Sequence, residues 1–178
     1  MALKKANLLV TGLPGTGKTT LIINLAERLK ELRPAGFYTE EIREGGTRKG
    51  FELRSFDGKK GLLSHVDVRS RRRVGKYGVD VSGFERFLES IPFGAPKTEL
   101  VIIDEIGRME CLSSKFRNLA VEILDSEKPL IATVALKGSG LIAEIKARPD
   151  IQLFEITRQN RDGLLAEILR GLDFALQD

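Results

Sequence analysis

The chain has 178 residues and a net charge of +4, with 42% hydrophobic and 30% charged side chains. The length indicates one domain spanning residues 1–178, and the apolar fraction excludes a largely disordered protein. No apolar run approaches the roughly 18 residues of a membrane span, and the first residues lack the apolar stretch of a signal peptide. The single cysteine, Cys111, excludes an internal disulfide. We therefore expect a cytoplasmic monomer with no membrane partner.

The chain begins with the pattern of a strand, a glycine-rich loop and a helix. Residues 7–11 form a short apolar run that ends at Gly12. From Lys18 to about Leu32, apolar side chains recur at helical spacing, and Pro34 ends the predicted helix.

Residues 36–66 predict a different arrangement. Strand-like runs flank the Gly45-Gly46 turn, and Asp57-Gly58 favours a second hairpin immediately afterwards. This part of the chain is expected to be an antiparallel excursion from the main sheet.

After the excursion, helical and strand patterns alternate to the end of the chain. We expect helices near residues 82–91, 116–124, 139–147 and 164–172, and strands at residues 100–103, 130–134 and 151–156. Ser82 is a candidate cap for the first of these helices. The alternation predicts an α/β fold of three layers, a mostly parallel sheet with helices on both faces. Ligands on such sheets bind at the carboxyl ends of the strands.

The glycine-rich loop satisfies the Walker A pattern G-x-x-x-x-G-K-[ST]. Its residues are Gly12, Leu13, Pro14, Gly15, Thr16, Gly17, Lys18, Thr19 and Thr20. Backbone N–H groups can turn inward around a phosphate only where glycine permits the dihedral angles, and the following helix N-terminus adds positive charge. Lys18 is expected to reach the β- and γ-phosphates, and Thr19 to ligate Mg²⁺.

A second motif, residues 100–105, is an apolar run that ends in Asp104 and Glu105. This is the Walker B form, in which Asp104 would hold Mg²⁺. Glu105 could polarise the water that attacks the γ-phosphate. The alternative is that both carboxylates merely end a strand at a solvated turn, which the intact phosphate loop makes the weaker reading.

Several blocks of the sequence together resemble the cancer-related or thermostable nucleoside-triphosphatase family. They are residues 12–19, 36–43 and 104–110, Thr133 with Lys137-Gly138, and Thr157 with Asn160-Arg161. The 36–43 and 104–110 blocks are the more discriminating ones, since many families share the Walker motifs. In relatives the position of Arg108 is often lysine and that of Cys111 often leucine.

The resemblance implies a small P-loop protein with a RecA-like core. It also implies hydrolysis of ATP, GTP, CTP, UTP and TTP with broad base tolerance, and slower use of diphosphates. By position, residues 12–19 would be the nucleotide loop and residues 100–107 the second nucleotide-associated segment.

Other residues have two readings each. Arg108 could stabilise transition-state charge or be a solvated arginine, and Lys137 could bind phosphate or be a surface lysine. Thr133 could sense the γ-phosphate or the water. Asn160-Arg161 could contact the base or ribose, or Asn160 could serve in capping the last helix.

Two other functions stay open at this point. A small-molecule or nucleoside kinase would need an arginine-rich lid, which the Arg69–Arg73 run could supply, although Glu105 argues for hydrolysis. A nucleic-acid partner is possible but not favoured, because Tyr77 is the only aromatic residue close to that basic run.

Overall fold

The computed structural model describes residues 3–177 of the chain and their side chains up to residue 172. The strands are β1 (Asn7–Thr11), β2 (Ala35–Glu44), β3 (Thr47–Ser55), β4 (Lys60–His65), β5 (Arg73–Val74), β6 (Tyr77–Val79), β7 (Val101–Ile106), β8 (Leu130–Val134) and β9 (Ile151–Glu155). The helices are α1 (Lys18–Arg28), α2 (Val81–Glu89), α3 (Ser114–Asp125), α4 (Leu141–Lys146) and α5 (Arg161–Gln177). Short 3-10 turns occupy Lys30–Leu32 and Glu110–Leu112.

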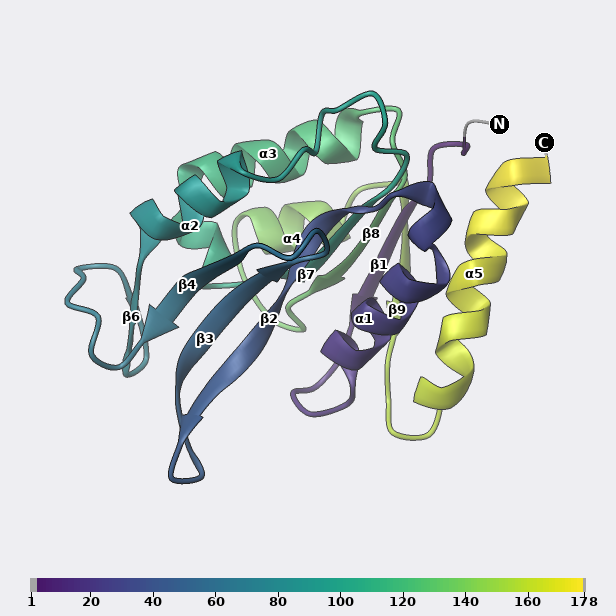
Figure 1. Cartoon of the computed structure of the whole chain (residues 1–178). Helices are drawn as coiled ribbons and strands as arrows, with labels where there is room; N and C mark the ends of the chain where they lie inside the picture. Colours follow the sequence, from purple (N-terminus) through teal and green to yellow (C-terminus); the bar gives the residue numbers. More distant parts are fainter. Residues whose placement is uncertain (1–2, 178) are drawn as a thin grey trace.

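The described strands form one 9-stranded sheet in the order β5-β6-β4-β3-β2-β7-β8-β1-β9 (Figure 1). From β2 to β9 in this order all neighbours are parallel, whereas β2, β3, β4, β6 and β5 pair antiparallel. The expected α/β fold with an antiparallel excursion is confirmed. The excursion continues beyond the expected residue 66, because β5 and β6 extend it to Val79.

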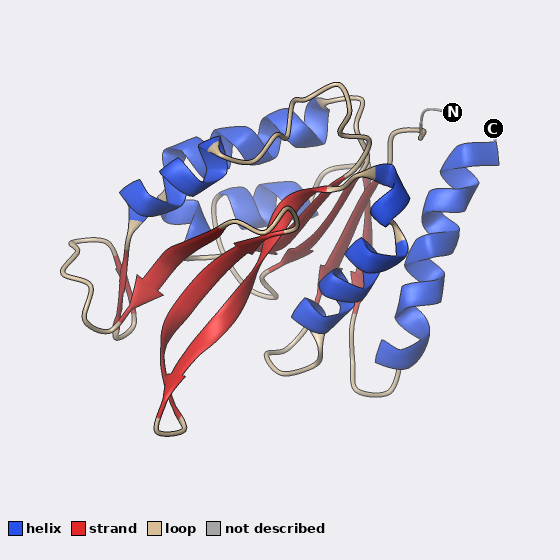
Figure 2. Cartoon of the chain, in the orientation of Figure 1, coloured by secondary structure: helices blue, strands red, loops and turns tan. Residues whose placement is uncertain are grey.

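Helices cover both faces of the sheet (Figure 2), and each face has its own hydrophobic core. Alternation along β1 divides the strand between the two cores: Leu9 packs in the core with α2, α3 and α4, while Leu8 and Val10 pack in the core with α1 and α5. All three side chains are buried, which explains why the sequence shows a continuous apolar run there. No helix within residues 3–177 is long and apolar enough to cross a membrane.

Some predicted helix boundaries were inaccurate. The first helix ends at Arg28, and a 3-10 turn follows it at Lys30–Leu32. The apolar spacing that predicted one helix up to Leu32 therefore covers two separate elements. Ser82 does not cap α2; the side chain of Asp80 does so, by accepting from Gly83 N at 3.0 Å. The predicted helix at 139–147 is shorter, spanning Leu141–Lys146.

The excursion joins the parallel strands through an unusually close approach of β2 to β7. Gly36 has φ +149°, and a Cβ on it would lie only 1.7 Å from Ile102 O. Only glycine can therefore occupy this position without displacing the neighbouring strand. The close approach sets β2, and with it Thr39, beside the end of β7.

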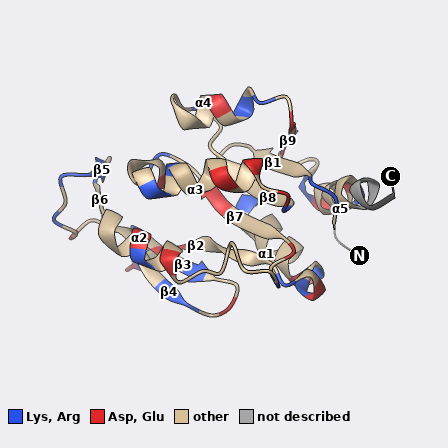
Figure 3. Cartoon of the chain, turned by 90° about the horizontal axis from the view of Figure 1, so that it is seen from above, with Lys and Arg blue, Asp and Glu red and all other residues tan. Residues whose placement is uncertain are grey.

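Strand β8 lies between the strand of the phosphate loop, β1, and the strand with the two carboxylates, β7. Since these three strands are parallel, their carboxyl ends meet at one edge of the sheet. Seen from above, they lie between α3 and α4 on one side and α1 on the other (Figure 3). The topology thus brings together motifs that are distant in the sequence.

Candidate active site

The phosphate loop turns directly from β1 into α1. Gly15 and Gly17 have φ values of 77° and 102°, in the left-handed region that glycine tolerates. The Thr16 hydroxyl donates to Leu13 O at 2.7 Å and braces the loop from within. This geometry leaves the first backbone amides of α1 free of intrahelical partners, as an anion-binding loop requires.

Lys18 lies folded over the loop that precedes it. Its ammonium group donates to Gly12 O at 2.8 Å and to Leu13 O at 3.0 Å. Leu13 is 62% exposed, and Pro14 is also exposed at the crest of the loop. The last residue of the motif, Thr20, is exposed in the first turn of α1.

Asp104 is the centre of the site, and two threonines hold its carboxylate. Thr19 Oγ1 donates to Asp104 Oδ2 and Thr133 Oγ1 to Asp104 Oδ1, both at 2.8 Å. Asp104 is only 2% exposed. Its pKa is raised by burial, while both threonine hydroxyls, the backbone amide of Thr39 and the charge of Lys18 oppose that rise.

The pair of Thr19 and Asp104 fits a Mg²⁺ site. Two neighbouring ligands of an octahedral Mg²⁺, each about 2.0–2.1 Å from the metal, lie about 2.9 Å apart. The 2.8 Å between Thr19 Oγ1 and Asp104 Oδ2 matches that spacing, and both donors are the hard oxygens that Mg²⁺ prefers.

Glu105 is half-buried and faces a cavity of about 220 Å³. Thr39 and Phe51 from the excursion also line this cavity, together with Arg108. Burial raises the pKa of Glu105, the nearby Asp104 charge raises it further, and Lys18 lowers it. A carboxylate with a raised pKa is a stronger base than an exposed glutamate.

Glu110 is a buried carboxyl group that the sequence reasoning did not assign to the site. It is 5% exposed and lines the same cavity as Glu105. A Cβ on Gly107 would lie 2.9 Å from Glu110 Oε2 and 3.2 Å from Glu105 Cδ, so the two carboxyl groups flank this glycine. Burial, and secondarily the Glu105 charge, raise the pKa of Glu110 well above its ordinary value. Only its place in the 104–110 block could have indicated it.

The two cationic candidates differ in position. Arg108 is exposed and is one of the residues that line the cavity of Glu105. Lys137 is exposed in the loop that follows β8, at the same edge of the sheet. Among the described residues, the Lys137 side chain forms no hydrogen bond or ion pair.

The turn before α5 lies against the phosphate loop. A Cβ on Gly12 would be 2.6 Å from Ile156 O, and one on Gly17 would be 3.9 Å from Arg161 Cδ. Asn160 serves the turn itself: Oδ1 accepts from Thr157 N at 2.7 Å and Nδ2 donates to Glu155 O at 2.7 Å. Its side chain is therefore occupied in shaping the helix start, which was one of its two readings.

The basic run Arg69–Arg73 lies elsewhere. It occupies the loop between β4 and β6 and enters β5, at the end of the sheet opposite β1 and β9 (Figures 1 and 3). Tyr77, the aromatic residue close to it, is 8% exposed and packs edge-on against Phe51 with ring centroids 5.6 Å apart. That ring is not available for stacking on a base.

Comparison with known proteins decides the family. A family model described as NTPase matches residues 7–169. The chain is 45% identical over 168 residues to "Nucleoside-triphosphatase THEP1" of Thermotoga maritima, covering 94% of this chain and 95% of that protein. The chain belongs to the THEP1 nucleoside-triphosphatase family.

Solved structures of related proteins have the same fold. THEP1 of the hyperthermophile Aquifex aeolicus superimposes with a TM-score of 0.81 at 37% identity, covering 93% of this chain and 98% of that one. A human cancer-related nucleoside triphosphatase gives a TM-score of 0.76 at 35% identity, covering 93% and 96%. The resemblance drawn from the sequence blocks is thus confirmed, and the P-loop fold is that of other THEP1 proteins.

Proposed function

We propose that this THEP1 protein is a Mg²⁺-dependent phosphohydrolase that cleaves nucleoside triphosphates to diphosphate and phosphate. The proposal depends chiefly on one observation, the 2.8 Å contact between Thr19 and Asp104, which joins the end of the phosphate loop to the end of β7. Lys18 directly precedes Thr19 in the sequence, and Glu105 directly follows Asp104. Membership of the nucleoside-triphosphatase family supports the same activity.

Each residue has a distinct part in the reaction. The loop amides and Lys18 bind the phosphates, and Thr19 with Asp104 would hold Mg²⁺. The bound Mg²⁺ would supply positive charge next to the transferring phosphoryl group. Glu105 orients a water molecule from the cavity side and accepts its proton as the oxygen attacks phosphorus in line with the leaving diphosphate.

Broad use of bases follows from where the contacts lie. The phosphate loop reads phosphate groups alone, so it does not distinguish ATP, GTP, CTP, UTP and TTP. The side chain of Asn160, next to the loop, is already occupied by Thr157 and Glu155. Diphosphates should react more slowly, because they would offer fewer phosphate contacts to Lys18 and the metal site.

The test is phosphate release from the five triphosphates, with and without Mg²⁺. We expect release without any acceptor and comparable rates across the panel. Lys18→Ala should lose most turnover and triphosphate affinity, whereas Lys60→Ala, an exposed lysine on β4, should not. Near-normal turnover by Lys18→Ala would contradict the phosphate-loop reading.

The same assay separates hydrolysis from the other two functions. A kinase would release little phosphate until a nucleoside or other acceptor is added. A nucleic-acid-dependent ATPase would be strongly stimulated by RNA or DNA in a salt-dependent way. The place of Arg69–Arg73, at the far end of the sheet from β1, argues against its use as a lid over the triphosphate.

A further inference from the structure

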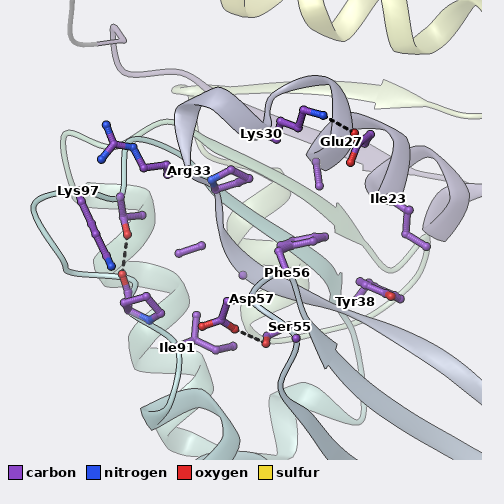
Figure 4. A pocket seen from close by; sticks show the side chains of 17 residues that line it. Ile23, Glu27, Lys30, Arg33, Tyr38, Ser55, Phe56, Asp57, Ile91 and Lys97 are labelled. Atoms are coloured by element: carbon purple, nitrogen blue, oxygen red, sulfur yellow. Dashed lines mark hydrogen bonds and ion pairs between the residues drawn. The ribbon is translucent and has the colours of Figure 1, made fainter.

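A second cavity in the described part of the chain is separate from the active site. It has a volume of about 540 Å³ and lies between the later turns of α1, the start of β2 and the turn after β3 (Figure 4). Pro34 and Thr98 belong to the segments that enter β2 and β7, so this end of the cavity lies at the amino ends of those strands. The phosphate loop and Asp104 lie at the carboxyl ends.

One wall of this second cavity is aromatic. The rings of Tyr38 and Phe56 lie with centroids 5.8 Å apart and an angle of 34° between their planes. Both residues are half-buried, and Ile23 and Ala26 of α1 continue the apolar surface. A flat aromatic ring would gain both apolar burial and stacking against this wall.

The opposite side of the cavity is cationic, since Figure 4 places Arg33 and Lys97 away from the two rings. The Arg33 guanidinium forms a long ion pair of 3.7 Å with Glu99, and the Lys97 side chain has no ion-pair or hydrogen-bond partner within residues 3–177. In the described chain Arg33 is the one non-glycine residue with positive φ, at 48°. Two cations on one rim suit a phosphate monoester, which carries about −1.5 to −2 charges at neutral pH.

The cavity also offers an acceptor. The Asp57 carboxylate already receives a hydrogen bond from Ser55 Oγ and one from Lys59 Nζ, the latter at 2.5 Å. An ionised carboxylate has about four acceptor positions, so further donors can be accommodated. A sugar hydroxyl is such a donor.

We propose that this cavity binds a nucleoside monophosphate at a site distinct from the triphosphate site. The base would stack on Phe56 and Tyr38, the phosphate would pair with Arg33 and Lys97, and the ribose hydroxyls would donate to Asp57. This inference concerns residues that play no part in the proposed hydrolysis, and it holds or fails independently of that reaction.

The experiment is an NMR titration of the ¹⁵N-labelled protein with AMP, with Mg²⁺ and a non-hydrolysable triphosphate present at saturation. We expect saturable shifts at the amides of Gly36 and Gly58, which line the cavity. Phe56→Leu keeps an apolar side chain but removes the ring, and should weaken AMP binding about tenfold. Lys97→Glu should weaken it several-fold, with a larger effect at low salt.

The controls separate the three contacts. Lys60→Glu reverses an exposed charge on β4 and should leave AMP affinity unchanged. Adenosine should bind more weakly than AMP, and its affinity should be unchanged by Lys97→Glu. The affinity for ribose 5-phosphate should be unchanged by Phe56→Leu. The amide spectrum of each variant reports whether it is folded.

Three results would overturn the proposal. The first is an absence of shifts around the cavity at millimolar AMP. The second is AMP binding that the triphosphate analogue abolishes, since the ligand would then occupy the phosphate loop. The third is unchanged AMP affinity in both folded variants, Phe56→Leu and Lys97→Glu.

Discussion

Thr133 donates from its hydroxyl to Asp104 Oδ1 over 2.8 Å, and both residues are buried at the ends of adjacent parallel strands. The bond fixes the orientation of the carboxylate and leaves Oδ2 directed at Thr19. A residue of the middle strand thus orients the carboxylate that we propose as a Mg²⁺ ligand on the neighbouring strand. The contact of Thr133 with the γ-phosphate or the attacking water stays a prediction beside this hydrogen bond.

Replacing Thr133 with valine should therefore weaken Mg²⁺ binding at the proposed metal site. The change leaves a buried acceptor on Asp104 without its donor, which costs about 1–3 kcal/mol of folding stability. We expect a lower melting temperature and a higher Mg²⁺ concentration for half-maximal turnover. Thr133→Ser keeps the hydroxyl and is the matched control. Equal Mg²⁺ dependence in the two variants would show that the hydrogen bond does not position Asp104.

Glu105→Gln should separate binding from chemistry. The amide is nearly the same size as the carboxylate but cannot accept the proton of the attacking water, so turnover should fall about 10²–10⁴-fold. Affinity for a non-hydrolysable triphosphate should change little, as measured by calorimetry. Glu167→Gln, an exposed substitution on α5, is the control. Turnover like that of the wild type would mean that another group takes the proton.

The buried Glu110 should make stability depend on pH. Its folded-state pKa is raised well above the ordinary 4.5, so the folded protein binds more protons than the unfolded chain between these two values. The free energy of unfolding must then fall as pH rises through that window. Glu110→Gln removes this loss, so the variant should gain stability relative to wild type at pH 8 compared with pH 5.

Urea unfolding of both proteins at the two pH values measures this difference. Glu122→Gln, on the exposed face of α3, should show no such pH-dependent gain. A constant difference between the Glu110 variant and wild type across pH would mean that Glu110 does not titrate differently on folding.

Gly36→Ala should damage the junction between β2 and β7. The added Cβ would lie 1.7 Å from Ile102 O, a backbone atom that cannot move without displacing its strand. We expect a loss of at least about 2 kcal/mol of stability, measured by thermal or urea unfolding. Gly94→Ala is the matched control, because a Cβ there meets nothing within 4 Å. Equal stability of the two variants would contradict the close approach.

Much of the parallel core could be predicted from local patterns. Strands β1 and β7 are buried on both faces, which gives continuous apolar runs in the sequence. Helices α1 and α3 are buried on one face, which gives apolar stripes at helical spacing. The phosphate loop was predictable because its chemistry requires a contiguous motif. Its partner Asp104 was predictable because it directly follows an apolar run with the pattern of a buried strand.

What the sequence did not reveal depends on contacts between distant segments. The strand order, with β8 between β1 and β7, is not a local property. The same holds for the backbone amide of Thr39 facing Asp104 and for the burial of Glu110, which looks like an ordinary surface glutamate in the sequence. Two very short strands, β5 and β6, lack any period to detect.

The pairing of β1 has a consequence for how the protein is made. Asn7 pairs with Leu130 of β8 and with Ile151 of β9, so the first strand finds both its neighbours late in the chain. During synthesis on the ribosome, the amino-terminal loop emerges early but lacks its lateral supports until nearly all of the polypeptide is available. Triphosphate binding should therefore require synthesis to have passed β9, and nascent chains that stop before Ile151 should be unable to bind triphosphate.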